Sequence, residues 1–195
     1  MEWQSADPET IADRLAHVLG REGAILALPG GRTPIPVYEA LAGRGRADGT
    51  IWPTDDRIVA HDHPASNYGT LRRSLAGMNV VALHEGARVP HFDLVWIGMG
   101  ADGHVASIFP NALDGLVTGR DVVRTRPDPL PPEAPFDRLT LTMDSLVDTN
   151  EAMLVITGAD KRRVFEAALA GDDRLPISRF VAKLSAPLTV YWSAQ

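Results

Sequence analysis

Residues 24–34 of the chain read Ala24-Ile25-Leu26-Ala27-Leu28-Pro29-Gly30-Gly31-Arg32-Thr33-Pro34. The first five are a short apolar run, which is typical of a buried strand. The prolines and glycines that follow break the run and predict a loop. Pro34 suits the first position of a helix, and we expect that helix to reach about Ala42. A strand, a loop and a helix in this order form the repeating unit of an α/β fold.

The same alternation continues on both sides of this stretch. Upstream, Asp7 caps and Pro8 begins a predicted helix with one apolar face. Residues 127–135 hold five prolines and predict an extended loop. We expect a single domain over residues 1–195, with a largely parallel, Rossmann-like sheet flanked by helices. The further strands are expected at 57–60, 80–83, 93–97, 121–125, 138–142, 152–156 and 187–192, and the further helices at 67–75 and 159–169.

Composition excludes several classes of protein. The chain has 195 residues, long enough to bury a core without a disulfide or a metal. It has no cysteine, which excludes thiolate-bound clusters and a cysteine nucleophile. The net charge of -6 argues against a general nucleic-acid binder. The sequence has no apolar run long enough to span a membrane and no visible signal peptide, so a cytoplasmic protein is expected.

The loop after the first apolar run has the composition of an anion site. Gly30 and Gly31 allow successive backbone N–H groups to point inward, as in the nests that bind phosphate. We expect Thr33 to cap the following helix, whose N-terminus also favours an anion. An ordinary strand-to-helix turn would have the same punctuation. Two basic residues near predicted strand ends, Arg138 and Lys161, could reach this loop.

A second loop, from Gly98 to His104, contains the pattern G-x-G-x-x-G. A dinucleotide site is disfavoured, because Pro110 stops the long helix that such a site needs. We expect instead a short helix over residues 105–109, with His104 at its N-terminus and therefore neutral. A neutral histidine can act as a general base, and Asp102 could orient it. The plainer reading is a histidine and an aspartate that only shape a turn.

A third loop region contains Asp55-Asp56-Arg57 and, further on, His61-Asp62-His63. Arg57 is a candidate anion clamp or oxyanion partner, or a solvated partner of an aspartate. Adjacent strand residues point to opposite faces, so at most one of the two aspartates is expected to face a shared site. The histidines suggest a metal site, but no strict ligand spacing is met.

Taken together and in this order, the motifs resemble the 6-phosphogluconolactonase family, within the wider group that includes glucosamine-6-phosphate deaminases. The block Gly98 to Pro110 is the most specific, and its ending resembles the lactonases rather than the deaminases. The chain differs at Arg32, where a serine is usual, and at Asp56, where a glutamate is usual. The matching segments are 30–34, 55–57, 66–67, 98–110, 138–142, Gly158 with Lys161, and 176–178.

The resemblance implies hydrolysis of 6-phospho-D-glucono-1,5-lactone to 6-phosphogluconate, the second step of the oxidative pentose phosphate pathway. It implies a small sugar-phosphate lactone as the partner and no metal, organic cofactor, nucleic acid or membrane. His104 would be the general base, assisted by Asp102 and Arg57. The phosphate would be held by Gly30, Gly31, Arg32, Thr33, Arg138 and Lys161.

Two alternatives remain at this point. A related isomerase or deaminase would need a second acid or base near His104, and the sequence offers no clear candidate. A non-catalytic sugar-phosphate sensor would keep the binding loop and have no use for the histidine. We expect a monomer or a weak homodimer in either case.

Overall fold

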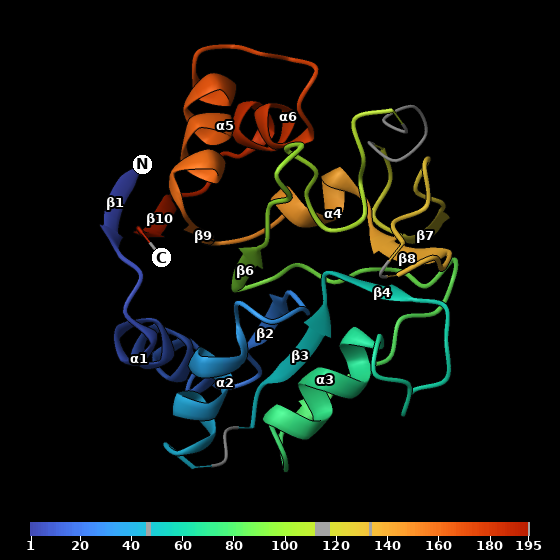
Figure 1. The fold of residues 1–195 in the computed structure, drawn as a ribbon. Helices are drawn as coiled ribbons and strands as arrows, with labels where there is room; N and C mark the ends of the chain where they lie inside the picture. Colours follow the sequence, from blue (N-terminus) through green and yellow to red (C-terminus); the bar gives the residue numbers. More distant parts are fainter. Residues whose placement is uncertain (46–47, 112–117, 133, 195) are drawn as a thin grey trace.

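The computed structural model describes residues 1–45, 48–111, 118–132 and 134–194. Within these residues seven strands form one sheet in which every neighbouring pair is parallel (Figure 1). In spatial order the strands are β1 (Glu2–Ser5), β10 (Leu188–Ser193), β9 (Ala152–Thr157), β6 (Leu94–Ile97), β2 (Ile25–Leu28), β3 (Thr50–Pro53) and β5 (Asn79–Val80). The expected α/β class with a largely parallel sheet is confirmed.

Helices cover both faces of this sheet, as Figure 1 shows. One face carries α1 (Pro8–Leu19), α2 (Ile35–Ala42) and α3 (Asn67–Ser74). The other carries α4 (Met143–Val147), α5 (Ala159–Leu169) and α6 (Pro176–Lys183). Each strand supplies both layers, because successive side chains point to opposite faces. Leu26 and Leu28 pack with the first set of helices, and Ala27 packs with the second.

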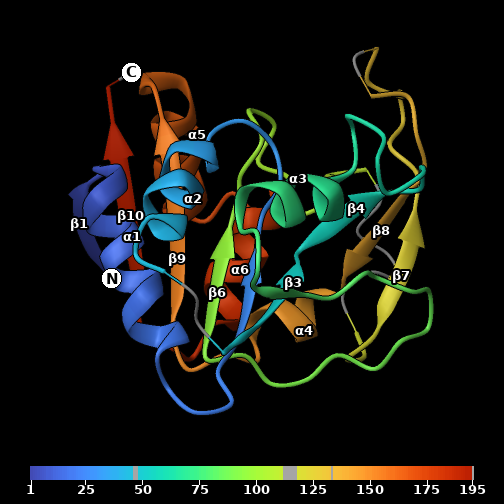
Figure 2. The same ribbon diagram turned by 90° about the horizontal axis from the view of Figure 1, so that it is seen from below.

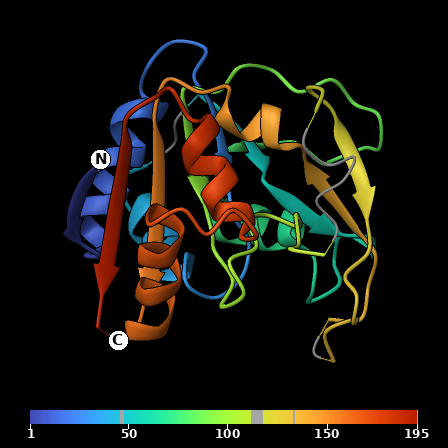
Figure 3. The same cartoon turned by 90° about the horizontal axis from the view of Figure 1, so that it is seen from above.

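A smaller sheet lies beside the main one, as Figures 2 and 3 show from below and from above. Within the part of the chain described, it is antiparallel and contains β4 (Asp55–Arg57), β8 (Arg138–Leu141) and β7 (Val122–Thr125), with β8 in the middle. The strand β4 follows β3 after a single residue, Thr54. The main sheet therefore passes the chain directly into the small sheet, at the edge where its strands end.

Several expected elements are confirmed and several are wrong. The helix capped by Asp7 forms, with the carboxylate accepting the Thr10 N–H at 2.8 Å. The strand expected at 57–60 is wrong: β4 ends at Arg57, and β3, β1, α4 and α6 were not expected. The short helix expected at 105–109 does not form, because Val105 pairs with Ile108 around a tight turn in which Ala106 has φ 49°. The proline-rich segment 127–135 is irregular where it is described; residue 133 lies outside the described residues.

Tyr38 and Trp96 connect the core to the loop after β2. The two rings meet edge to face at 5.6 Å between centroids. The Tyr38 hydroxyl donates to the carbonyl oxygen of Pro29 at 2.6 Å, and complete burial raises the pKa of this phenol well above its usual value. The buried pair of Tyr38 and Trp96 thus holds Pro29 in place, at the start of the glycine loop, residues 29–34.

His91 bridges two chain segments at the opposite edge of the sheet, before β6 and β9 begin. Its Nδ1 lies 2.8 Å from Asp148 Oδ1, and its Nε2 lies 3.0 Å from Asn150 Oδ1. Asp148 also pairs with Arg120. The hydrogen bond to Asp148 raises the pKa of the His91 imidazole, because the carboxylate favours the charged ring.

We predict that His91→Ala loses most stability at acidic pH. A raised folded-state pKa gives stabilisation that is complete below the unfolded value of about 6.5 and disappears as the pH rises through the folded value. The free energy of unfolding from urea titrations should differ from wild type most near about pH 5.5 and least near about pH 8.5, by at most about 1 kcal/mol because the ring is half exposed. His84→Ala is the control at an exposed histidine, and a difference that grew with pH would contradict this assignment.

Candidate active site

The site lies where the order of the sheet strands reverses. The chain proceeds from β2 to β3 and β5 on one side, and β6 then returns to the other side of β2. At such a point the loops after the two central strands diverge and leave a crevice at their carboxyl ends. These loops are residues 29–34 and 98–104, and both line a cavity of about 360 Å³. Residues from β4, α3, β6, β8, β9 and α5 also line it.

Asp102 and His104 form a hydrogen-bonded pair in the second loop. Asp102 Oδ1 lies 2.6 Å from His104 Nδ1 and also accepts the His104 backbone N–H at 3.2 Å. The bond to His104 lowers the pKa of the Asp102 carboxyl, so this group is a carboxylate at neutral pH. In the neutral tautomer in which Nδ1–H donates to Asp102, the other ring nitrogen, Nε2, carries no proton. His104 lines the cavity, whereas Asp102 stands behind it.

Gly100 and Phe109 set the position of the histidine ring. A Cβ on Gly100 would stand 2.2 Å from His104 Nδ1 and 2.6 Å from Asp102 Oδ1, so only glycine fits below the pair. Phe109 packs on the other side, 5.0 Å between ring centroids. The sequence predicted that His104 stands at the start of a helix, and this prediction is wrong. A helix dipole therefore has no part in the chemistry of this residue. Among the described side chains, Asp102 is the one that makes a hydrogen bond to the His104 ring.

Arg57 and Arg138 face each other across the antiparallel pair β4 and β8. Arg57 Nη1 donates to Ala65 O and to Asn67 Oδ1, both at 2.9 Å, and Arg138 Nη2 donates to Ala134 O at 2.9 Å. Arg57 Nε and Arg138 Nη1 are buried and have no hydrogen-bond partner among the described residues.

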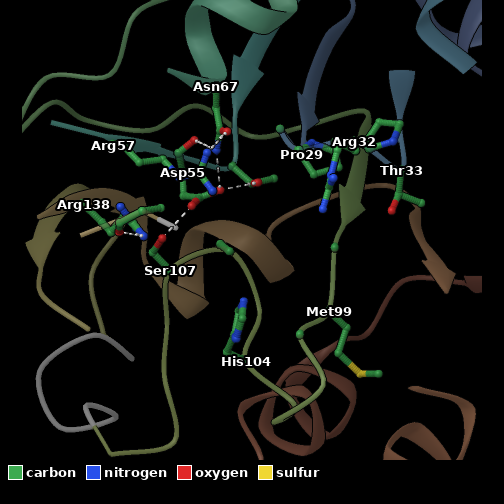
Figure 4. Close-up of a pocket in the computed structure, with 18 of the residues that line it drawn as sticks. Pro29, Arg32, Thr33, Asp55, Arg57, Asn67, Met99, His104, Ser107 and Arg138 are labelled. Atoms are coloured by element: carbon green, nitrogen blue, oxygen red, sulfur yellow. Dashed lines mark hydrogen bonds between the residues drawn. The ribbon is translucent and has the colours of Figure 1, made fainter. Parts of the chain in front are cut away.

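This pairing favours an anion in the cavity. Burial lowers the pKa of Arg138, and the positive charge of Arg57 adds to that effect. Like charges directly opposite each other destabilise a sheet, and unsatisfied buried donors cost free energy. Anionic groups of a bound ligand that accept from the two guanidinium groups would relieve both penalties through charge-assisted hydrogen bonds. Figure 4 shows the two arginines on the left of the cavity and His104 below them.

The two aspartates before Arg57 point in different directions, as expected. Asp56 turns to α3, where it accepts the backbone N–H groups of Asn67 at 2.6 Å and Tyr68 at 3.2 Å; burial raises the pKa of its carboxyl. Asp55 lines the cavity and accepts the Ser107 hydroxyl at 2.5 Å. Ser107 therefore donates its proton to a buried carboxylate and is not arranged as a nucleophile.

Sequence reasoning named Asn67 only as part of the matching segment 66–67 and assigned it no role, whereas the structure places it in the cavity wall. Its Nδ2 donates to Asp55 Oδ1 at 3.2 Å, while its Oδ1 accepts from Arg57 Nη1. The Asn67 amide therefore bridges the Asp55 carboxyl group and the Arg57 guanidinium group. It also fills the space above Gly30, where a Cβ would lie 2.0 Å from Asn67 Cγ. The only available signal was Ser66-Asn67 at a helix start, and Ser66 does cap α3.

The glycine loop lines the cavity opposite the arginine pair. Gly31 has φ +88°, the left-handed region that favours glycine. Thr33 was expected to cap α2, which is wrong: Pro34 is the capping residue, without a side-chain hydrogen bond, so the Thr33 hydroxyl is not used for capping. Figure 4 shows Arg32 and Thr33 at the right of the cavity, with the Arg32 side chain extending toward its centre.

Lys161 enters the cavity from the first turn of α5. Burial lowers the pKa of its ammonium group, and the nearby negative charge of Asp102 opposes that shift. The sequence-predicted residues that line the cavity are Gly30, Gly31, Arg32, Thr33, Arg57, His104, Arg138 and Lys161.

The histidines suggested as metal ligands have other neighbours. His61 packs on Tyr68 at 4.5 Å between ring centroids, and His63 packs on Phe136 at 5.3 Å. His63 Nδ1 accepts the Ala65 N–H at 3.0 Å. Across the residues that the structure describes, no group of three or more His, Cys, Asp or Glu could hold a metal ion. No helix in the same residues is long and apolar enough to cross a membrane.

Comparison with known proteins gives one consistent family. The model described as glucosamine-6-phosphate isomerases/6-phosphogluconolactonase matches residues 4–84 and 76–192. The chain is 34% identical to the 6-phosphogluconolactonase of Pseudomonas putida, covering 96% of this chain and 90% of that protein. It is 35% identical to that of Pseudomonas aeruginosa, covering 93% and 87%. The crystal structure of a 6-phosphogluconolactonase from Shewanella baltica superposes with a TM-score of 0.84 at 27% identity, covering 100% and 98%.

We predict that alanine is tolerated differently at the two loop glycines. The Cβ of Gly31→Ala meets open space. The substitution should lower the free energy of unfolding only by the strain of a left-handed alanine, about 1–2 kcal/mol. Gly30→Ala displaces Asn67 and should cost more, with a changed environment of the Asn67 amide. Urea unfolding gives the two costs and NMR reports the amide. Equal costs and an unchanged Asn67 signal would contradict the packing described for Gly30.

Proposed function

The chain belongs to the family of glucosamine-6-phosphate isomerases and 6-phosphogluconolactonases, and from that membership we propose that it hydrolyses 6-phospho-D-glucono-1,5-lactone to 6-phosphogluconate, as a single domain over residues 1–195. One observation carries the proposal. A histidine oriented through Nδ1 faces the same cavity as Arg57 and Arg138, each of which has one buried side-chain nitrogen without a hydrogen-bond partner among the described residues. Such a cavity suits an anionic substrate with an electrophilic carbon.

The reaction begins with proton transfer from water. His104 Nε2 accepts a proton as the water oxygen attacks C1 of the lactone, and Asp102 stabilises the imidazolium through Nδ1–H. The carbonyl oxygen becomes an oxyanion, which Arg57 Nε is free to stabilise. The bond between C1 and the ring oxygen then breaks. The imidazolium returns its proton to that oxygen, which becomes the C5 hydroxyl, and the carboxylic acid releases its own proton to solvent.

The phosphate takes the remaining positive charge of the cavity. Arg138 Nη1 and the Lys161 ammonium group supply charged donors. The loop of Gly30, Gly31, Arg32 and Thr33 supplies backbone and hydroxyl donors and one further charge. This anchor fixes the distance between the phosphate and C1, so binding energy from a remote group orients the reacting carbon. It also explains how a protein of net charge -6 can bind an anion.

The proposal is tested with freshly made 6-phosphogluconolactone. A coupled assay with 6-phosphogluconate dehydrogenase follows NADPH formation above spontaneous hydrolysis, with EDTA present throughout. We expect acceleration, and its persistence in EDTA would agree with chemistry that needs no metal. No acceleration by folded protein would contradict the proposal. Glucosamine 6-phosphate, added as an alternative substrate with ammonia release as the readout, separates the lactonase from the related deaminase activity.

We predict that His104→Ala lowers kcat/KM by about 10²–10⁴-fold, the usual contribution of a general base. Calorimetric binding of 6-phosphogluconate should change little, because the phosphate anchor is intact. His84→Ala is the matched control, because His84 is exposed and does not line the cavity, and it should keep full activity. Full lactonase activity in His104→Ala would overturn the mechanism, and retained binding with no activity in the wild type would favour a sensor.

We predict a different signature for the anchor. Arg138→Met or Lys161→Met removes a charge-assisted hydrogen bond worth about 1.5–3 kcal/mol, which corresponds to about 10–150-fold in KM for the phosphorylated lactone. Hydrolysis of glucono-1,5-lactone, which carries no phosphate, should be little affected. The comparison of the two substrates for each variant is the measurement. An equal loss on both substrates would assign these residues to the reacting carbon rather than to the phosphate.

A further inference from the structure

Arg162 lies between two tryptophan rings at the edge of the main sheet. Its guanidinium carbon is 5.1 Å from the centre of the Trp3 ring and 4.6 Å from that of Trp192, both within cation–π distance. Trp3 belongs to β1 and Trp192 to β10, so the first and the last strand of the chain share one side chain of α5. Figure 1 shows α5 beside these two strands. We call Trp3, Arg162 and Trp192 the aromatic clamp.

The clamp continues into the backbone at the start of α5. Gly158 N–H donates to Ser193 O at 2.9 Å, and Gly158 O accepts Trp192 Nε1–H at 3.3 Å. Gly158 has φ +86° and ψ 159°, a conformation that is open essentially to glycine alone. The last strand therefore holds the residue that begins the helix on both its donor and its acceptor side.

Lys161 precedes Arg162 directly, and successive helix residues point about 100° apart. The Arg162 side chain is held in the clamp, and Lys161 lies against the cavity. Holding one fixes the azimuth of the other. Within the described part of α5, the first turn has no side-chain cap, so its position depends on contacts from outside the helix.

We propose that Arg162 and Trp192 are positioning residues, which set the first turn of α5 so that the Lys161 ammonium group reaches the phosphate of the substrate. This inference rests on the proposed function, because it concerns the anchor of that same site. Neither residue lines the cavity, so their effect passes through Lys161. Trp3 supplies one of the two rings of the clamp, so the exposed edge strand β1 also contributes to the position of Lys161.

The test compares four variants. Arg162→Ala empties the clamp, Arg162→Lys keeps a cation in it, and Trp192→Phe keeps a ring but loses the Nε1–H donor to Gly158. Arg163→Ala is the matched control: it removes an arginine of the same helix turn that is exposed and paired with Asp160. For each variant kcat and KM are measured with the phosphorylated lactone and with glucono-1,5-lactone.

We expect Arg162→Ala and Trp192→Phe to raise KM for the phosphorylated lactone by about threefold to tenfold, with kcat within about twofold of wild type. Hydrolysis of glucono-1,5-lactone should stay unchanged, so the preference for the phosphorylated substrate falls. Arg162→Lys should restore most of it, and Arg163→Ala should match wild type. An unchanged preference, or equal losses on both substrates, would overturn the proposal.

A readout that needs no turnover separates this inference from the proposed function. The rate of Lys161 acetylation by acetic anhydride, measured by mass spectrometry across pH, gives the titration midpoint of its amine. Release from the cavity wall should move that midpoint upward in Arg162→Ala and leave it unchanged in Arg163→Ala. A wild type without lactonase activity would overturn the proposed function alone, whereas equal midpoints in both variants would overturn the positioning of Lys161.

Discussion

Two guanidinium groups, those of Arg57 and Arg138, sit opposite each other on paired strands and are partly removed from water. Their mutual repulsion is the constraint to which the rest of the cavity responds. Asp55 supplies a compensating negative charge. The Asn67 amide links it to Arg57 by donating to Asp55 and accepting from Arg57. The small antiparallel sheet brings the two arginines together, and Asp56 keeps Asn67 in reach by accepting its backbone N–H. The donors that remain unused define where an anion belongs.

The parallel sheet could be predicted from the sequence because its strands are local signals. The apolar run ending at Leu28 and the one ending at Ile97 are bounded by glycines, which leaves little doubt about strand and loop. The strand β1 carried no such signal, because an edge strand is exposed and needs no apolar alternation. The small sheet was predicted only in part, for another reason. The strands β7 and β8 were expected, but β4 pairs with β8 between residues more than eighty positions apart, and no local pattern encodes that pairing.

For the site, the sequence indicated residue types better than their arrangement. Asp102 and His104 were predicted as a pair and lie within one loop, where spacing alone suffices. The hydrogen bond from Ser107 to Asp55 could not be read from spacing, because the two residues are 52 positions apart. The expected short helix failed on the same ground: Val105 and Ile108 are both fully buried, and the core contact that they make together outweighs helical spacing. Contacts formed only in the folded chain decide the conformation of residues 105–108 and the partner of Ser107, and local sequence patterns do not encode them.

Trp96 belongs at once to the core and to the wall of the cavity. It is 1% exposed, packs against Tyr38, and yet borders the space enclosed by the glycine loop. The Tyr38 hydroxyl continues that contact to Pro29, at the start of the same loop. The molecule thus has a fluorophore on the cavity wall, which contacts the loop after β2 through Tyr38. Of the four tryptophans, Trp96 is the one on the cavity wall, so a change in its fluorescence can follow occupancy of the cavity without a label, while Trp3 and Trp192 lie at the sheet edge and Trp52 packs on Phe92.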